Sequence, residues 1–156
     1  MKKGLLWVML GIAGSVGCAG TMGALSSPAV AQGSRFVIQV PPETQEEVKE
    51  EMVGILLAMQ TIINKTLEGN GQAIQAVVEP FTATGTQGHP EIVMFLSKYP
   101  DKFSAWRQLG RNGMHATFSR IERLAESQPL DKEAIFKETG TLLGYCYGCH
   151  ATFTFP

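Results

Sequence analysis

Two cysteines and a histidine stand close together near the end of the chain, in the segment Cys146-Tyr147-Gly148-Cys149-His150. The cysteines are three positions apart, and the histidine follows the second cysteine directly. Covalent attachment of a c-type haem requires this spacing. On one helical turn the two thiols can reach the two vinyl groups of a haem while His150 reaches its iron. We therefore expect the rest of the chain to build a pocket around this segment.

Other chemistries of paired cysteines fit this sequence less well. A structural zinc site needs a second pair of ligands, and a thioredoxin-like dithiol follows a strand. The chain has no second ligand pair, and the residues around Cys146 and Cys149 follow a helical pattern. The sequence therefore favours haem. One alternative stays open, a haem-free helical interaction module in which Cys146 and Cys149 form a disulfide.

The first 31 residues have the composition of an export signal. Lys2 and Lys3 precede an apolar stretch, and Ala29-Val30-Ala31 is placed for cleavage before Gln32. The sequence thus predicts a signal peptide over 1–31, a single domain over 32–156, and a periplasmic location without a retained membrane span. A retained membrane anchor and lipid attachment at Cys18 are the alternatives.

Cysteine count and charge exclude two further classes of protein. Loss of Cys18 with the signal peptide leaves only Cys146 and Cys149, too few for an exported disulfide framework. Loss of Lys2 and Lys3 leaves 11 basic against 14 acidic residues, a net charge of −3. Such a chain has no basic stripe to neutralise phosphates, so we expect no nucleic-acid partner.

Four amphipathic helices are predicted in the rest of the chain. Gln32 to Pro42 is expected to be an extended lead-in, and the first helix to begin at a capping box formed by Thr44 and Glu47. Its apolar stripe consists of Val48, Met52, Ile55, Leu56, Met59, Ile62, Ile63 and Thr66. Gly69-Asn70-Gly71 should end it.

The second helix is expected from Gln72 to about Pro80, followed by a long connection over Thr84 to Tyr99 that holds a short helical piece at Glu91 to Leu96. The third helix is expected over Asp101 to Ser127, and the last helix begins at Asp131. With no strand period and no repeat, the pattern predicts an all-α fold, an antiparallel four-helix bundle with the haem-attachment segment on its C-terminal helix.

These features resemble the class II cytochromes c, the cytochrome c-prime group, which are four-helix bundles with one haem at a C-terminal CxxCH. The resemblance rests on Cys146 to Phe153, read as CxxCHxxF, and on Pro90-Glu91-Ile92 with Phe103 following. It implies one covalent haem c attached to Cys146 and Cys149, with His150 as the proximal iron ligand.

The family divides on what lies at the other face of the iron. In its low-spin branch a methionine on the first helix is the sixth ligand, and counting back from Gly69 places Met52 there, with Met59 as the fallback. A thioether favours ferrous iron, and closing the sixth site keeps reorganisation small. In the c-prime branch the sixth site is open and binds small gases such as nitric oxide or carbon monoxide. Met52 resembles the first branch.

The chain departs from the family pattern at two positions. Gas-binding members usually carry a basic residue directly after the CxxCHxxF aromatic, where this chain has Thr154. The tryptophan that often follows Pro-Glu-Ile is Val93 here, and Trp106 is the residue that could replace it against the haem. Lys49 lies near a family basic residue that pairs with a haem propionate.

Two histidines outside the attachment segment have a simpler interpretation. His115 falls with Arg107 and Arg111 on the polar side of the third helix, where we expect it to be solvated. His89 precedes Pro90 in the connection, where a polar loop residue is expected and a role as second histidine ligand is the lesser alternative.

The sequence thus predicts an exported monohaem protein that passes single electrons between redox protein partners and is not an enzyme. The alternative is a five-coordinate gas-binding protein of the c-prime type. Because family members often pair through their first two helices, a homodimer is a further expectation.

Overall fold

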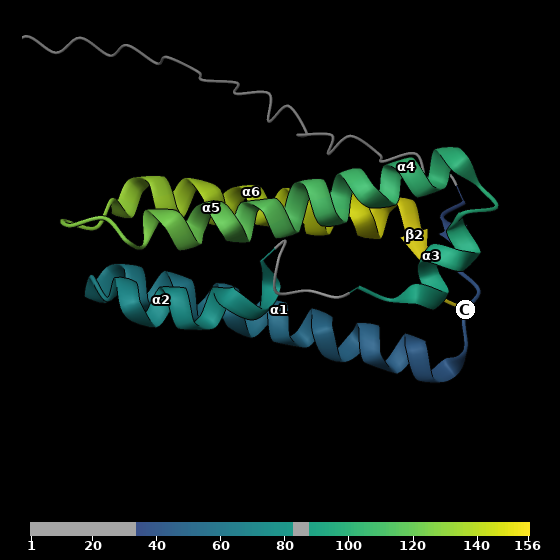
Figure 1. The fold of residues 1–156 in the computed structure, drawn as a ribbon, viewed down its shortest axis with the longest axis horizontal. Coiled ribbons are helices and arrows are strands. Elements are labelled where there is room, and N and C mark those ends of the chain that lie inside the picture. The colour runs from purple at the N-terminus through teal and green to yellow at the C-terminus, as the bar shows by residue number, and fades with distance from the viewer. Residues whose placement is uncertain (1–33, 83–87) are drawn as a thin grey trace, which may run out of the picture. The chain divides into compact units, whose positions relative to one another are not determined.

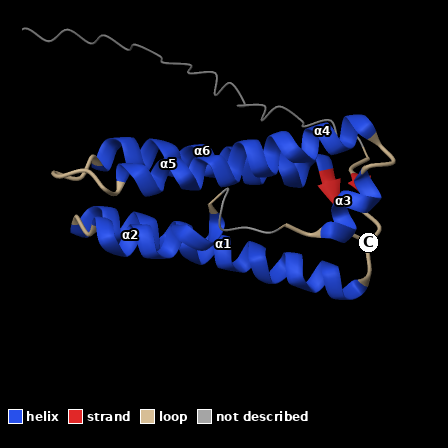
Figure 2. Ribbon diagram, viewed as in Figure 1, coloured by secondary structure: helices blue, strands red, loops and turns tan. Residues whose placement is uncertain are grey.

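Helices make up most of the chain that the structure describes. The structure, a computed structural model, describes residues 34–82 and 88–156, so the predicted signal peptide lies outside the described residues. Figure 1 and Figure 2 show long helices and two very short strands, which confirms the all-α prediction. The elements are β1 (Phe36–Val37), α1 (Pro42–Glu68), α2 (Gly71–Val78), a 3-10 turn (Glu79–Phe81), α3 (Pro90–Leu96), α4 (Pro100–Leu109), a π-helical segment (Gly110–His115), α5 (Ala116–Leu124), α6 (Lys132–Thr152) and β2 (Phe153–Thr154).

Helix α1 begins earlier than its sequence suggests. Pro42 is its first residue, and no side chain caps its N-terminus, so the predicted capping box of Thr44 and Glu47 is wrong. Proline suits the first position because the N–H that it lacks would have no helical partner there. Thr44 is instead buried inside the first turn.

The predicted apolar stripe of α1 is confirmed at most of its positions. Val48, Ile55, Met59, Ile62 and Thr66 are buried. Leu56 and Ile63, however, are 61% and 41% exposed. Residues at this helical spacing spread over a broad sector of the helix, and these two lie at its solvent side.

The turn after α1 follows the predicted stop at Gly69-Asn70-Gly71. Gly69 has a φ of 74°, the left-handed conformation that favours glycine, and the Asn70 side chain accepts a hydrogen bond from Ala73 N at 3.0 Å to cap α2. A Cβ on Gly71 would lie 2.2 Å from the carbonyl oxygen of Ala125 at the end of α5. The start of α2 therefore packs directly on the α5 backbone.

The predicted third helix is present, but it is not a regular α-helix. Helix α4 leads through the π-helical segment Gly110–His115 into α5 without a break, and α5 ends at Leu124. The π-helical segment was not predicted, because i→i+5 hydrogen bonding has no strong composition signal. Helix α6 begins as predicted, since the Asp131 side chain accepts a hydrogen bond from Ala134 N at 3.0 Å.

The two strands join the extended lead-in to the end of the chain. β1 and β2 pair in parallel, with Phe36 opposite Phe153, and Ile38 N donates a hydrogen bond to Thr154 O at 2.8 Å. The extended lead-in was predicted and its pairing was not, because two-residue strands have no readable alternation. This pairing holds Phe153, which directly follows α6, against Phe36, which precedes α1.

Two clusters of buried apolar side chains pack the helices. Figure 1 shows α2 beside α1 and α5 beside α6, and residues of α1 also contact α6 while residues of α2 contact α5. The first core lies among these helices and consists of Ile55, Ala58, Met59, Ile62, Ile74, Val78, Met114, Phe118, Ile121, Ala125, Ile135 and Leu142. The second core lies among β1, the start of α1, α3 and β2 and consists of Ile38, Val48, Ile92, Leu96 and Phe153. Met52 packs against both.

Within residues 34–82 and 88–156, no helix is both long and apolar enough to cross a membrane.

Candidate functional site

A cavity of about 480 Å³ lies between the two cores. A volume of this size is within the range of small-molecule and cofactor sites. Residues from α1, the segment before α3, α3, α4, the π-helical segment and α6 line it. They are Val48, Glu51, Met52, Gly88, His89, Ile92, Val93, Phe103, Trp106, Arg107, Leu109, Gly110, Arg111, Met114, His115, Tyr145, Cys146, Cys149 and His150.

Helix α6 brings the attachment segment to this cavity. Cys146, Cys149 and His150 all line it, and both cysteines are free thiols with partly buried side chains. Burial raises the pKa of the Cys146 thiol. Burial, and to a smaller extent the charge of a Cys146 thiolate, raises the pKa of Cys149 to about 11. Both thiols are therefore protonated near pH 7.

Two glycines set the close approach of α6 to the preceding helices. A Cβ on Gly148, between the two cysteines, would lie 2.9 Å from Cδ2 of Leu109 on α4. A Cβ on Gly113 would lie 2.5 Å from Cε1 of Tyr145 on α6. Because a real Cβ almost never comes so close to another atom, glycine at both positions allows the cavity walls their present spacing.

Helix α1 contributes one of the two predicted methionines to the cavity. Met52 lines it together with Cys146, Cys149 and His150. Met59 is 5% exposed, belongs to the first core and is not among the lining residues. The structure therefore brings Met52 to the attachment segment and keeps the fallback Met59 away from it.

His89 is held against α1 next to Met52. Its side chain is 17% exposed, and its Nε2 lies 3.0 Å from Oε2 of Glu51, with Nδ1 3.6 Å from Oε2 of Glu47. Both His89 and Glu51 line the cavity. The polar residue that the sequence analysis expected in the connection is thus tied to a carboxylate at the edge of the cavity.

The expectation that His115 is solvated is wrong. His115 is partly buried, lines the cavity, and its Nδ1 lies 2.9 Å from the carbonyl oxygen of Phe81. His115 lies in the π-helical segment, yet it shares the face of Arg107 and Arg111, and all three line the cavity. Because a carbonyl oxygen only accepts, Nδ1 carries the proton of this bond, and Nε2 is left for another partner. Gly110 and Gly113, close together inside a helical pattern, were the signal that could have indicated this irregularity.

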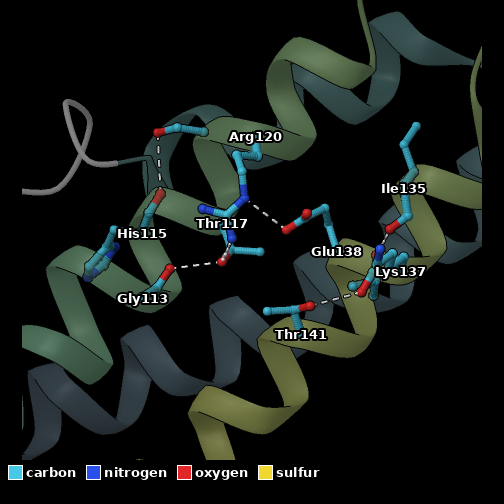
Figure 3. A network of polar contacts seen from close by, with 10 residues as sticks. Gly113, His115, Thr117, Arg120, Ile135, Lys137, Glu138 and Thr141 are labelled. Carbon is cyan, nitrogen blue, oxygen red and sulfur yellow. Dashed lines mark hydrogen bonds and ion pairs between the residues drawn. The ribbon is translucent and has the colours of Figure 1, made fainter.

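A polar network fixes the π-helical segment to its neighbours (Figure 3). Arg120 on α5 donates to Oε2 of Glu138 on α6 at 3.0 Å and to Oγ1 of Thr117 at 2.6 Å. Thr117 in turn donates to the carbonyl oxygen of Gly113 at 2.9 Å. Thr117 is fully buried, so these bonds act largely out of water and hold the segment that carries His115 in place.

The remaining predicted residues are divided between the cavity and the surface. Trp106 lines the cavity and contacts the Phe153 ring edge-on, at 5.4 Å between ring centroids. Val93 also lines it. Lys49 does not line it: its Nζ pairs with Oε1 of Glu46 at 2.6 Å on the exposed face of α1. The structure therefore separates Lys49 from the predicted site.

No group of three or more His, Cys, Asp and Glu side chains within the described part of the chain is arranged to hold a metal ion by itself. Comparisons with models of known protein families, with characterised proteins and with solved structures find no match to this chain.

Proposed function

We propose that this chain is an exported monohaem c-type cytochrome, similar to the class II cytochromes c, that carries single electrons between redox protein partners. One observation carries the proposal: the two thiols and the imidazole of the attachment segment on α6 line the same cavity as the Met52 thioether on α1. These are the side chains that can attach a haem and ligate its iron.

The residues around the cavity fit such a group. Cys146 and Cys149 would hold haem c through thioether bonds, and neither thiol has another covalent partner. His150 and Met52 would be its iron ligands. Val48, Ile92 and Leu109 give the cavity apolar walls. When bound, the haem supplies a one-electron ferric/ferrous couple, and nothing in this proposal makes or breaks substrate bonds.

The protein's part in electron transfer is to keep this environment constant. His150 and Met52 would keep the protein ligands of a bound haem the same in both oxidation states, and the apolar side chains of the cavity would limit its contact with water, so that little reorganisation would accompany transfer. Leu143 and Tyr147, on the same helix as the attachment segment, are 57% and 61% exposed. An aromatic and an aliphatic side chain at this place suit contact with a redox partner.

The proposal includes an antiparallel four-helix bundle as the scaffold. Helix α1, helix α2, the combined helix from α4 through α5, and helix α6 would be its four members. The contacts of α1 with α2 and α6, and of α5 with α2 and α6, support this arrangement. Export to the periplasm rests on the composition of residues 1–31, and the N-terminal sequence of the mature protein, expected to begin at Gln32, tests it.

The absorption spectrum of the reduced protein tests the proposed ligand set. After expression with a cytochrome maturation system, we expect a haem stain that survives denaturing electrophoresis and a sharp low-spin α band that carbon monoxide does not change. A colourless protein would contradict haem binding. A broad high-spin spectrum that shifts with carbon monoxide would instead support the five-coordinate, gas-binding alternative.

The same methionine-to-leucine change at two positions distinguishes iron ligation by a methionine from its packing in the core. Met52→Leu should lose the low-spin spectrum, whereas Met59→Leu should keep it, because Met59 lies in the first core. Leucine has nearly the volume of methionine, so both variants should fold. A low-spin spectrum that survives in Met52→Leu would exclude Met52 as the ligand.

A further inference from the structure

Three basic side chains follow one edge of the cavity. Arg107 on α4, and Arg111 and His115 on the π-helical segment, all line it and are spaced four residues apart. Residues at this spacing lie on neighbouring turns of one helical face. The two arginines carry the positive charge of this edge, and we call Arg107 and Arg111 the basic rim.

The positive charge of the basic rim is not neutralised by the chain's own acids. In residues 34–82 and 88–156, the ion pairs of arginine, lysine and histidine side chains involve Lys49, Lys65, His89 and Arg120. Glu51 is the one acidic residue among those that line the cavity, and it is paired with His89. Neither guanidinium of the basic rim has a carboxylate partner in this part of the chain.

Local contacts hold the basic rim at the cavity. The Arg107 guanidinium lies 5.8 Å from the centroid of the Phe103 ring, which itself lines the cavity. The bond of His115 Nδ1 to the Phe81 carbonyl orients the imidazole at the same edge, and this tautomer has no second N–H to offer a carboxylate. Figure 3 shows the His115 ring directed away from Arg120 and Glu138, so the polar network that fixes the backbone does not use the ring.

From this placement we infer that the basic rim binds the carboxylates of the group that enters the cavity, which are the two propionates if that group is haem. The inference rests on the proposed function for the identity of the group. A planar guanidinium presents parallel N–H donors that match the two oxygens of a carboxylate. The structure thus gives this role to residues of α4 and the π-helical segment, while Lys49 lies outside the cavity.

A porphyrin that cannot form thioethers tests the basic rim separately from haem attachment. Zinc mesoporphyrin IX carries ethyl groups in place of vinyls and keeps both carboxylates, and its dimethyl ester lacks the free carboxylates. Binding of each to the full haem-free chain can be followed by porphyrin fluorescence. We expect the diacid to bind about tenfold more tightly than the diester, a difference of about 1.4 kcal/mol that two exposed charge pairs can supply.

Arg107→Gln/Arg111→Gln should abolish this preference. Arg123→Gln is the matched control, because Arg123 is exposed on α5 and does not line the cavity. It should retain the preference of the unmodified chain. Both substituted rim arginines are exposed, so the double variant should fold, which far-ultraviolet circular dichroism checks.

Equal binding of the diacid and the diester to the unmodified chain, or an unchanged preference in the double variant, would overturn the inference. An equal loss in Arg123→Gln would also overturn it, because net charge alone would then account for the effect. Covalent haem staining is scored independently. A chain that stains for haem but shows no diacid preference contradicts only the basic rim, and the reverse result contradicts only the proposed cytochrome function.

Discussion

The first core and the cavity differ in how the same helices are used. In the first core, side chains of α1, α2, α5 and α6 fill the space between the helices. Nearer the attachment segment, residues of α1 and α6, together with residues of α3, α4 and the π-helical segment, line a cavity of about 480 Å³. The comparison shows that the filled first core stabilises the fold, while the cavity beside it brings the attachment segment and Met52 together.

The largest effect on stability is expected when an aromatic ring is removed from the first core. Phe118 is fully buried and lies 5.4 Å from the Phe81 ring, centroid to centroid. Phe118→Ala should lower the free energy of unfolding by about 3–5 kcal/mol, because the deletion leaves a cavity. Phe103→Ala, at the half-buried wall of the cavity, should cost less than half as much. Urea unfolding followed by helical circular dichroism measures both, and equal costs would contradict the division between the two regions.

The next largest effect is expected where the π-helical segment meets α6. A Cβ on Gly113 would lie 2.6 Å from the carbonyl oxygen of Gln108 and even closer to Tyr145, so Gly113→Ala should destabilise the fold by about 1–3 kcal/mol. Gly144→Ala on α6 is the control, because a Cβ added there would have no other atom within 4 Å. That substitution should instead stabilise the helix by about 0.5–1 kcal/mol. Thermal unfolding measures both, and the same sign for both variants would show that the close approach at Gly113 is not needed.

A smaller effect is expected from the network that links α5, α6 and the π-helical segment. The side chains of Arg120 and Glu138 are 37% and 22% exposed, so solvent screens much of their attraction. Glu138→Gln should therefore cost only about 1 kcal/mol, and Glu68→Gln, which breaks the more exposed pair with Lys65, less than half of that. In the haem-loaded protein, Glu138→Gln should also alter the Soret circular dichroism through the π-helical segment. A Soret spectrum changed equally by Glu68→Gln would contradict that link.

The elements that were predictable are those whose sequence signals are local. The stop at Gly69, the cap at Asp131 and the break at Pro80 each depend on a residue whose backbone chemistry permits few alternatives. The start of α1 was predicted wrongly because Thr44 and Glu47 satisfy the capping pattern, while the proline at position 42 begins the helix first.

The candidate site was predictable where its spacing is set by one helical turn. Cys146, Cys149 and His150 form such a group, and the structure places all three at the cavity. His115 and Glu51 could not be assigned in this way. The bond of His115 to Phe81 and the bond of Glu51 to His89 each join positions that are far apart in the sequence. Contacts of this kind depend on tertiary packing and not on local pattern.

The smallest effect on stability, with the clearest effect on assembly, is expected on the outer face of α1. Val53, Leu56 and Leu57 are 57%, 61% and 59% exposed. The opposite face of α1 is buried in the two cores. We expect this outer face to pair with a second copy, because burial of apolar area contributes about 25 cal/mol per Å². Leu56→Glu should then change the unfolding free energy of the monomer by no more than about 0.5 kcal/mol while dissociating the dimer, as sedimentation velocity would measure. Leu143→Glu changes a leucine of α6 that is 57% exposed and should leave the dimer intact. Dissociation of the dimer by both variants would show that the interface is not specific to the outer face of α1.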